Sequence, residues 1–329
     1  MSATANVAIH SSQFPEQIRR DLLESLRSRK IAHKFHYDSV KQTQKWLALH
    51  QQYSPSRTDQ NCLDIYEQSF ALAAKAINSE KVNVIGLGCG GGQKDSRLIA
   101  MLKRGRNDVF YTPCDVATAM VLTARQTALS VLPGNQILPF VCDLQTANDV
   151  SANFDLPRVR RLRRIITFFG MIPNFEPNNI LPKLASLVRP KDVLLFSANL
   201  APGDNYAAGT KRVLPQYDNP LTRNWLLAFL MDIGFSKTDG TLAFEIENTR
   251  DGLKRIVAHF RFKRPRQIEI DNESFDFKSG ETIRLFFSYR YTSERIRAHL
   301  SRHKLEVQRE WIAESGEEGV FLCSLKKKR

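Results

Sequence analysis

The stretch that decides the fold is Val82-Asn83-Val84-Ile85-Gly86-Leu87-Gly88-Cys89-Gly90-Gly91-Gly92. Residues 82–87 are mostly apolar and predict a buried β-strand, and residues 94–104 predict a helix just after the glycines. Glycines at such a junction let the backbone turn tightly and let a ligand come close to the backbone amides. Because five of the seven residues 86–92 are glycine, the loop favours a ligand site over a purely structural turn.

The glycine spacing fits two kinds of cofactor loop. Gly86, Gly88 and Gly91 satisfy G-x-G-x-x-G, which is the fingerprint of dinucleotide-binding folds. Gly86, Gly88 and Gly90 satisfy G-x-G-x-G, which is common in S-adenosylmethionine sites. The loop therefore indicates a nucleotide-type cofactor and leaves open which one it is.

Strands and helices alternate along the chain after this loop. The expected strands are residues 109–111, 137–141, 164–169 and 192–198, and the expected helices are residues 117–129 and 180–187. Strands that alternate with helices at this spacing pair in parallel. The sequence therefore predicts an α/β fold whose core is a doubly wound, Rossmann-like sheet.

The pattern differs on both sides of this region. Upstream, residues 21–30 and 62–77 predict helices, and residues 35–38 and 53–57 between them are expected to be loops. Downstream, a helix and then several extended segments are expected at residues 225–233, 243–247, 255–262, 267–270 and 281–291. The last elements are a helix at 292–303 and a hairpin of residues 306–311 and 320–325. Closely spaced extended runs predict antiparallel hairpins, and hence a second lobe of α+β type.

Composition excludes several classes of protein. Of the 329 residues, 42% are hydrophobic, enough for a sizeable core and too many for a disordered chain. No apolar run approaches the ~18–20 residues of a membrane helix, and Met1–His10 lacks the pattern of a signal peptide. Five widely spaced cysteines argue against a disulfide framework and for a reducing, cytoplasmic compartment. No histidine or cysteine group has metal-ligand spacing, so no metal is expected.

The chain carries a formal net charge of +14. Such a balance permits nucleic acid or an anionic ligand as partner and selects neither. Basic residues cluster at 158–164, 261–266 and 326–329, without the repeated aromatic residues of a base-stacking surface. Solvated faces are the favoured interpretation, and a nucleic-acid partner stays as the alternative.

Acidic residues follow two successive expected strands. Asp115, after the strand at 109–111, can accept hydrogen bonds from both ribose hydroxyls of an adenosine. Asp143, after the strand at 137–141, can accept a hydrogen bond from the adenine amine while Leu144 packs on the ring. Open sheets bind ligands at these strand ends, so the functional interpretation is favoured over loop or cap roles. Lys94 either pairs with a cofactor carboxylate or is an ordinary solvated lysine.

Six segments, in order along nearly the whole chain, share motifs with one family. They are residues 35–38 (Phe-His-Tyr-Asp), 53–57 (Tyr-Ser-Pro-Ser-Arg), 84–95 (the glycine loop with its lysine), 111–116 (Tyr-Thr-Pro-Cys-Asp-Val), 169–177 (Phe-Gly-Met-Ile-Pro-Asn-Phe-Glu-Pro) and 280–288. Together they resemble the histidine-specific, S-adenosylmethionine-dependent methyltransferases. This family includes the ergothioneine-pathway enzyme and fungal dimethylallyltryptophan N-methyltransferases.

The resemblance implies a division of the chain and a set of contacts. It implies a methyltransferase core at residues 63–200 and 289–329 and a substrate-binding lobe at residues 14–62 and 201–288. Combined with the strand-end residues, the expected S-adenosylmethionine contacts are Gly86, Gly88, Gly90, Lys94, Asp115, Asp143 and Leu144. The resemblance also implies that Asn174 and Tyr217 face the carboxylate and amine of an amino acid, near Tyr53 and Ser288.

The chain departs from the family pattern at three positions. Phe286 stands where the family has a glutamate that helps to hold the substrate imidazole. An unpaired buried polar group costs ~1–3 kcal/mol, so this change disfavours histidine as the acceptor. Gly86 replaces an acidic residue at the strand end, which weakens polar contacts to the cofactor, and Pro173 replaces a glycine. We expect a larger or more apolar acceptor, or an altered function.

Methyl transfer from a sulfonium to an amine gains mainly from in-line positioning in a dry pocket. Tyr37 and Tyr217 are the candidate catalytic residues, because with Tyr53 they can shape the pocket and orient the amine. Aromatic faces also attract a methylated cation by ~0.5–2 kcal/mol. Tyrosines are equally common as packing residues at the edge of a core.

Three hypotheses remain open. The leading one is a methyltransferase that acts on the amine of an amino acid or related small molecule. The second is a methyltransferase that acts on nucleic acid, prompted by the net charge. The third is a catalytically inactive homologue that binds S-adenosylmethionine or a partner, prompted by Gly86 and Phe286.

Overall fold

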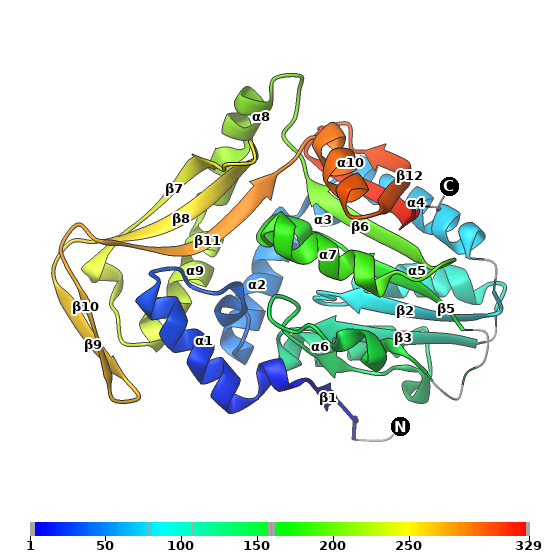
Figure 1. Cartoon of the computed structure of the whole chain (residues 1–329), viewed down its shortest axis with the longest axis horizontal. Coiled ribbons are helices and arrows are strands. Elements are labelled where there is room, and N and C mark those ends of the chain that lie inside the picture. The colour runs from blue at the N-terminus through cyan, green and yellow to red at the C-terminus, as the bar shows by residue number, and fades with distance from the viewer. Residues whose placement is uncertain (1–3, 78, 107, 157–158, 160–161, 327–329) are drawn as a thin grey trace.

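The computed structural model describes residues 4–77, 79–106, 108–156, 159 and 162–326. The described chain forms a large mixed sheet with helices on both faces and a smaller lobe beside it (Figure 1). The α/β class and the second lobe expected from the sequence are confirmed. None of the helices in this part of the chain is long and apolar enough to cross a membrane.

The large sheet has the strand order β1-β4-β3-β2-β5-β6-β13-β12. Its parallel strands are β1 (Ala8–Ile9), β2 (Lys81–Leu87), β3 (Asp108–Asp115), β4 (Phe140–Val141), β5 (Arg163–Phe168) and β6 (Val193–Asn199). The antiparallel hairpin of β12 (Leu305–Ile312) and β13 (Glu318–Leu325) extends the sheet beyond β6. Since β2 lies between β3 and β5, the glycine loop leaves the sheet near its centre.

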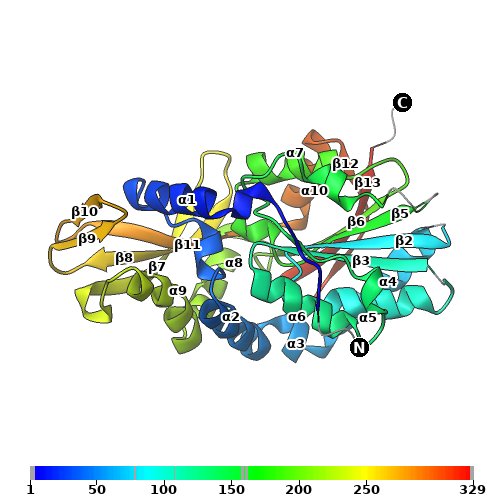
Figure 2. The same ribbon diagram turned by 90° about the horizontal axis from the view of Figure 1, so that it is seen from below.

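Helices cover both faces of this sheet (Figure 2). One face packs on α4 (Gln60–Ala76), α5 (Gln93–Lys103) and α6 (Thr118–Ala128). The other packs on α7 (Pro177–Leu187) and α10 (Ser293–Arg302). The central strands are buried on both sides, which explains why they are nearly continuous apolar runs.

The lobe is built on a three-stranded antiparallel sheet in the order β11-β8-β7. Its strands are β7 (Gly240–Asn248), β8 (Lys254–Phe262) and β11 (Thr282–Arg290), and the hairpin β9 (Arg266–Ile270) and β10 (Glu273–Phe277) projects beyond it. Helices α1 (Pro15–Arg27), α2 (Val40–Tyr53) and α9 (Pro220–Asp232) close its apolar core. Short helices α3 (Pro55–Thr58) and α8 (Tyr206–Val213) complete it. The division of residues between core and lobe stays a proposal.

Most elements expected from the sequence are present, with some corrections. Residues 53–57, expected to be a loop, lie in the end of α2 and in α3. Helices α2 and α8, strands β1 and β10, and the start of α1 at Pro15 were not expected from the sequence. Of the expected basic cluster at 158–164, Arg158, Arg160 and Arg161 lie outside the described residues, as do residues 327–329 of the tail.

Candidate functional site

The carboxyl ends of β2, β3 and β4 meet around a cavity that we call the inner cavity. It encloses about 630 Å³ of space not filled by protein atoms, part of it open to solvent. Five of the seven expected cofactor residues line it, namely Gly88, Gly90, Asp115, Asp143 and Leu144. The structure therefore brings together residues that are up to 56 positions apart in the sequence because their strands are neighbours in the sheet.

The glycine loop adopts a backbone that other residues rarely tolerate. Gly88, Gly90 and Gly92 have φ angles of +63°, +51° and +73°. A Cβ atom on Gly88 would lie 2.5 Å from Cγ of Met171, and one on Gly90 would lie 3.2 Å from the ring of Trp46. Glycine is thus required both by the turn and by the close approach of the surrounding walls.

Asp115 closes one side of the inner cavity at the end of β3. Its carboxylate accepts hydrogen bonds from the backbone amides of Gly90 (3.1 Å) and Ala117 (3.2 Å). Burial raises the pKa of Asp115 to about 6, although these hydrogen bonds act in the opposite direction. The carboxylate fixes the loop and keeps lone pairs for further donors.

Asp143 lies at the end of β4 and is held by the N-terminal segment. Its carboxylate accepts a hydrogen bond from the amide of Gln145 (2.8 Å) and lies 3.6 Å from Nζ of Lys34. Its own amide donates to Oγ of Ser12 (3.0 Å). Leu144, the next residue, lines the same cavity.

These walls suit an adenosyl group. Two carboxylates can accept hydrogen bonds from hydroxyl and amine groups, and apolar side chains such as Leu144 and Met120 can pack against a ring. The glycine cradle at Gly88 and Gly90 lacks the side chains that would fill the space. The two carboxylates, the apolar side chains and the shape of the cavity therefore fit S-adenosylmethionine.

Gly86 does not line the inner cavity. It is buried in β2, and a Cβ atom at this position would lie 2.2 Å from Oδ2 of Asp95. Asp95, on α5, accepts hydrogen bonds from the hydroxyls of Tyr111 (2.7 Å) and Thr167 (2.7 Å), and burial raises its pKa to about 6. The carboxylate of Asp95 occupies the space of the missing side chain. Asp95 was not among the residues expected from the sequence, although it directly follows Lys94.

Lys94 lies in a small neighbouring cavity under the glycine loop, together with Arg57 and His50. Its ammonium donates to the hydroxyl of Tyr66 (2.9 Å) and lies 4.0 Å from the carboxylate of Glu318. Burial lowers the pKa of Lys94, and Glu318 opposes this shift. Lys94 is thus a partly buried, hydrogen-bonded cation beside the glycine loop and not a fully solvated helix residue.

A second hollow, which we call the outer cleft, lies between the core and the lobe. It encloses about 1730 Å³ of unfilled space, including open solvent. All five expected substrate residues line it, namely Tyr53, Asn174, Tyr217, Phe286 and Ser288. Five residues line both hollows, namely Tyr37, Trp46, Gly88, Met171 and Asn174. The two hollows are therefore adjacent, as a donor site and an acceptor site must be.

Aromatic rings form much of the wall on the lobe side of the cleft. Ring centroids of Tyr37 lie 5.9 Å from Trp46 and 5.5 Å from Trp225, and Trp225 lies 5.7 Å from Phe286. The phenol of Tyr37 is buried, and burial together with the nearby Asp115 raises its pKa. Tyr37 is therefore a neutral phenol that shapes the wall and does not serve as a base.

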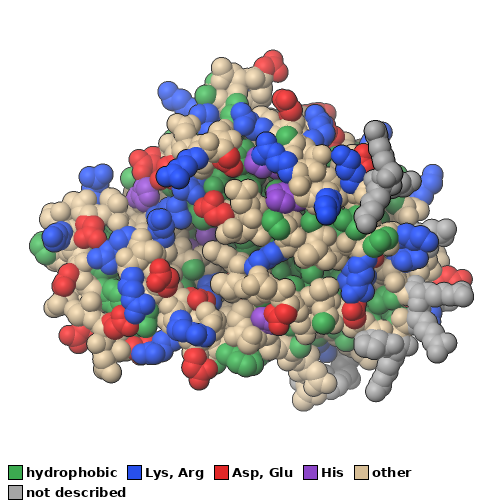
Figure 3. Space-filling view, in the orientation of Figure 1, with side chains coloured by type: hydrophobic (Ala, Val, Ile, Leu, Met, Phe, Trp, Pro, Cys, Tyr) green, Lys and Arg blue, Asp and Glu red, His purple; other side chains and the backbone are tan. Residues whose placement is uncertain are grey.

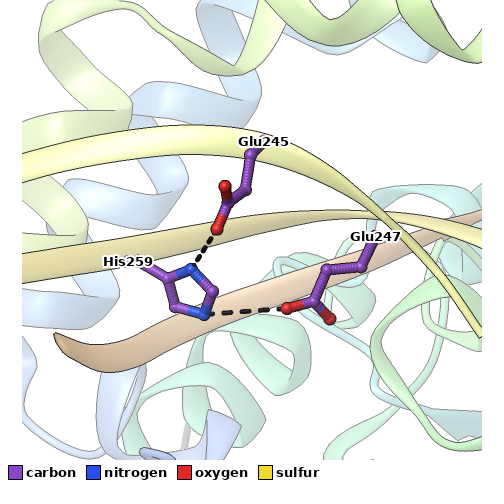
Figure 4. Close-up of side chains that lie close together, drawn as sticks. All are labelled: Glu245, Glu247 and His259. Atoms are coloured by element: carbon purple, nitrogen blue, oxygen red, sulfur yellow. Dashed lines mark hydrogen bonds and ion pairs between the residues drawn. The ribbon is translucent and has the colours of Figure 1, made fainter.

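A group of metal-ligand type lies elsewhere, on β7 and β8 (Figure 4). Nδ1 of His259 is 2.5 Å from Glu245, and Nε2 is 3.8 Å from Glu247. Glu247 also pairs with Arg255 at 2.8 Å. The two glutamates of the cluster thus already pair with His259 and Arg255. The cluster lines neither the inner cavity nor the outer cleft.

Comparisons with known proteins agree on one relationship. The family described as "Histidine-specific methyltransferase, SAM-dependent" matches residues 18–325. The histidine N-alpha-methyltransferase of Mycobacterium tuberculosis is 24% identical over 323 residues, which cover 93% of this chain and 94% of that protein.

Similarity to solved structures is lower. A methyltransferase from Thermobifida fusca is 11% identical, with 92% of this chain and 97% of that chain covered and a TM-score of 0.47. The CcbJ methyltransferase of Streptomyces caelestis is 12% identical. The match covers 80% of this chain and 90% of that chain, with a TM-score of 0.40. The family match carries the relationship, and these structures add nothing to it.

Proposed function

As a member of the family of histidine-specific, S-adenosylmethionine-dependent methyltransferases, this chain is an S-adenosylmethionine-dependent methyltransferase, and we propose that its acceptor is the amine of an amino acid with an aromatic or apolar side chain. Its relative from Mycobacterium tuberculosis is named for N-alpha methylation of histidine. The proposed acceptor therefore has the same kind of reacting amine as histidine and a different side chain.

The cofactor is proposed to lie in the inner cavity. Asp115 would hold the ribose hydroxyls, and Asp143 with Leu144 would hold the adenine ring. The amide of Gly88 would face the rest of the cofactor, with Lys94 near the carboxylate of the cofactor. When bound there, S-adenosylmethionine supplies an electrophilic methyl group on a sulfonium.

The protein's own contribution is positioning. Tyr37 and Asn174 line both hollows and are proposed to hold the acceptor amine in line with the methyl group. Tyr217 would orient the amino acid from the lobe side. Both tyrosines are proposed as catalytic residues in this orienting sense, since the neutral amine needs no strong base.

The surroundings of Phe286 are the observation that supports an aromatic or apolar side chain on the acceptor. Its ring is 7% exposed, packs against Trp225 and lies within 6.3 Å of the ring of Tyr217. The nearest polar ring, that of His33, lies 5.2 Å from Phe286, but both of its nitrogens are buried without a partner. Phe286 itself offers a substrate imidazole no hydrogen bond, and the polar groups beside it are the hydroxyls of Tyr217 and Ser288, whereas an aromatic ring would pack against Phe286 and Trp225.

The test is a panel of amino acids incubated with the protein and S-adenosylmethionine, followed by mass spectrometry of the products. We expect methylated products from L-tryptophan or L-phenylalanine at rates about 10-fold or more above L-histidine, as the loss of one buried hydrogen bond implies. Equal or faster methylation of histidine would contradict the proposed side-chain preference. Absence of any methylated amino acid would contradict the proposed function as a whole.

A further inference from the structure

The turn that follows β4 is held to α7 by one lysine side chain. Nζ of Lys183 donates to the carbonyl oxygens of Leu144 (3.1 Å), Gln145 (2.7 Å) and Ala147 (2.9 Å). An ammonium group has three protons and no acceptor, so these three bonds use its whole hydrogen-bonding capacity. The three carbonyls belong to the same turn as Asp143, whose carboxylate lines the inner cavity.

Hydrogen bonds within the turn explain why it accepts a lysine at this end. The amides of Thr146 (3.2 Å) and Ala147 (2.9 Å) donate to the carbonyl of Asp143, and the amide of Gln145 (2.8 Å) donates to the Asp143 carboxylate. A turn closed in this way leaves carbonyls at its C-terminal end without partners in the turn, as the end of a helix does. A lysine near such carbonyls can bond them, and Lys183 therefore completes the turn.

Lys183 is more than a surface lysine. It is partly buried, and burial lowers its pKa, although the nearby negative charge of Asp143 opposes this shift. A small cavity with about 370 Å³ of unfilled space, part of it open to solvent, lies between the turn and α7 and is lined by Lys183, Leu144 and Ala147. The bonds of Lys183 thus connect the turn to α7 where the packing of side chains is incomplete.

The other side of the turn faces the inner cavity, which Asp143 and Leu144 both line. Oδ1 of Asp143 accepts from the amide of Gln145, whereas Oδ2 lies 3.6 Å from Nζ of Lys34 and keeps lone pairs for a further donor. The amide of Leu144 has no acceptor among the described residues. An acceptor and a donor on consecutive residues match the edge of adenine, whose amine donates and whose N1 accepts.

We propose that Lys183 sets the preference of this protein for an adenine base, because it holds Asp143 and Leu144 at the spacing that the amine and N1 of adenine require. This inference rests on the cofactor placement proposed above and deepens it. Lys183 is a positioning residue, since its ammonium is fully used by the turn and does not line the inner cavity.

The test compares two ligands that differ only in the base, S-adenosylhomocysteine and S-inosylhomocysteine. In the second ligand a carbonyl replaces the amine and N1 carries a proton, so both hydrogen-bonding groups are reversed. We expect the wild-type protein to bind the adenosyl ligand about 100-fold more tightly in calorimetry. Lys183→Met should weaken the adenosyl ligand about 10-fold and leave the inosyl ligand within about 3-fold, so that the preference falls about 10-fold. An unchanged ratio in Lys183→Met would overturn the inference.

The ratio of the two dissociation constants separates this role from a structural one, because a general loss of stability weakens both ligands alike. Lys183→Arg keeps a cation with several donors and should restore most of the preference. Lys103→Met, at an exposed position of α5, is the control and should match the wild-type protein. Should Lys183→Met not fold, Lys183→Gln takes its place, and the same ratio decides.

A double-mutant cycle tests whether Lys183 acts through Asp143. Asp143→Asn should itself remove most of the preference, and adding Lys183→Met should then change the ratio by less than about 3-fold. Additive effects on the ratio would overturn the proposed route. Equal binding of the two ligands by the wild-type protein would overturn both the inference and the placement of adenine. No acceptor takes part in these measurements, so a wrong acceptor in the methylation panel would leave the inference standing.

Discussion

At the scale of single residues, Asp115 links the glycine loop to the proposed cofactor. Its carboxylate holds the amide of Gly90 and would accept the ribose hydroxyls. Asp115→Asn should therefore weaken S-adenosylhomocysteine binding by about 100-fold in calorimetry, with little change in the thermal unfolding midpoint. An unchanged dissociation constant would contradict the assigned role.

The same residue predicts a pH dependence. Because the pKa of Asp115 is raised to about 6, the carboxyl takes up a proton as the pH falls through 6 and loses its capacity to accept from two hydroxyls. Affinity for S-adenosylhomocysteine should be constant above pH 7 and fall below pH 6, and Asp115→Asn should remove this dependence. Asp95 titrates near the same pH, so Asp95→Asn is the control that should preserve it.

Gly86 and Asp95 behave as one unit, because the carboxylate of Asp95 fills the space beside Gly86. Gly86→Asp alone should lower the free energy of unfolding by about 2–4 kcal/mol, since two carboxylates would then share one buried site. Adding Asp95→Thr should restore most of this loss. A double-mutant cycle by denaturant unfolding measures the coupling, and additive effects would show that the two positions are independent.

Phe286 carries the expected change of acceptor. Phe286→Glu should raise kcat/KM for L-histidine at least several-fold and lower it for L-tryptophan, because the cleft wall gains a hydrogen-bond acceptor. Phe286→Leu keeps the wall apolar and should not improve histidine. If both variants change histidine methylation alike, the polarity of this wall does not select the acceptor.

The sequence was informative about residues whose role follows from their place at a strand end. The glycine loop and the expected strand ends predicted that Gly88, Gly90, Asp115 and Asp143 lie around one cavity. The role of Asp95 could not be predicted, because it depends on a tertiary contact: the carboxylate of Asp95 fills the space beside Gly86.

At the scale of elements, the N-terminal turn at Ser11–Gln13 supports the strand ends of the core. Oγ of Ser12 accepts from the amide of Asp143 (3.0 Å), and Nε2 of Gln13 donates to the carbonyl of Val116 (2.6 Å). The turn thus braces the backbone next to both aspartates of the inner cavity.

Ser12→Ala and Gln13→Ala should each weaken S-adenosylhomocysteine binding about 3- to 10-fold, because each removes one hydrogen bond that positions a wall of the cavity. Ser11→Ala, at an exposed neighbouring position, should have no effect. Isothermal calorimetry on the three variants decides the point. Equal affinities would mean that the strand ends keep their positions without the turn.

Two elements show why sequence patterns failed. In α2 the fully buried residues are the polar Gln42 and Thr43, and the apolar residues that pack on the lobe core, Trp46, Leu47 and Leu49, lie close together near its middle, so its apolar periodicity is weak. The strand β10 follows Asp271 and Asn272, which have φ angles of +52° and +68°. An Asp-Asn pair between extended segments is a hairpin signal that could have been recognised.

At the scale of the whole molecule, the basic clusters are partly neutralised. Arg264 and Arg266 both pair with Asp239, and Arg164 pairs with Asp192. On the face shown in Figure 3, basic and acidic side chains are interspersed. The face in this view therefore carries no continuous basic patch of the kind that nucleic acid binds.

The shared wall between the inner cavity and the outer cleft has a thermodynamic consequence. In the proposed division of the chain, Tyr37 and Trp46 belong to the lobe, whereas Gly88 and Asn174 belong to the core. A ligand that shifts these side chains in one hollow changes the affinity of the other, and linkage requires the effect to be reciprocal. The affinity for the methyl donor would then depend on whether the acceptor is bound, and the reverse. The affinity for S-adenosylhomocysteine would likewise change when the methylated product dissociates.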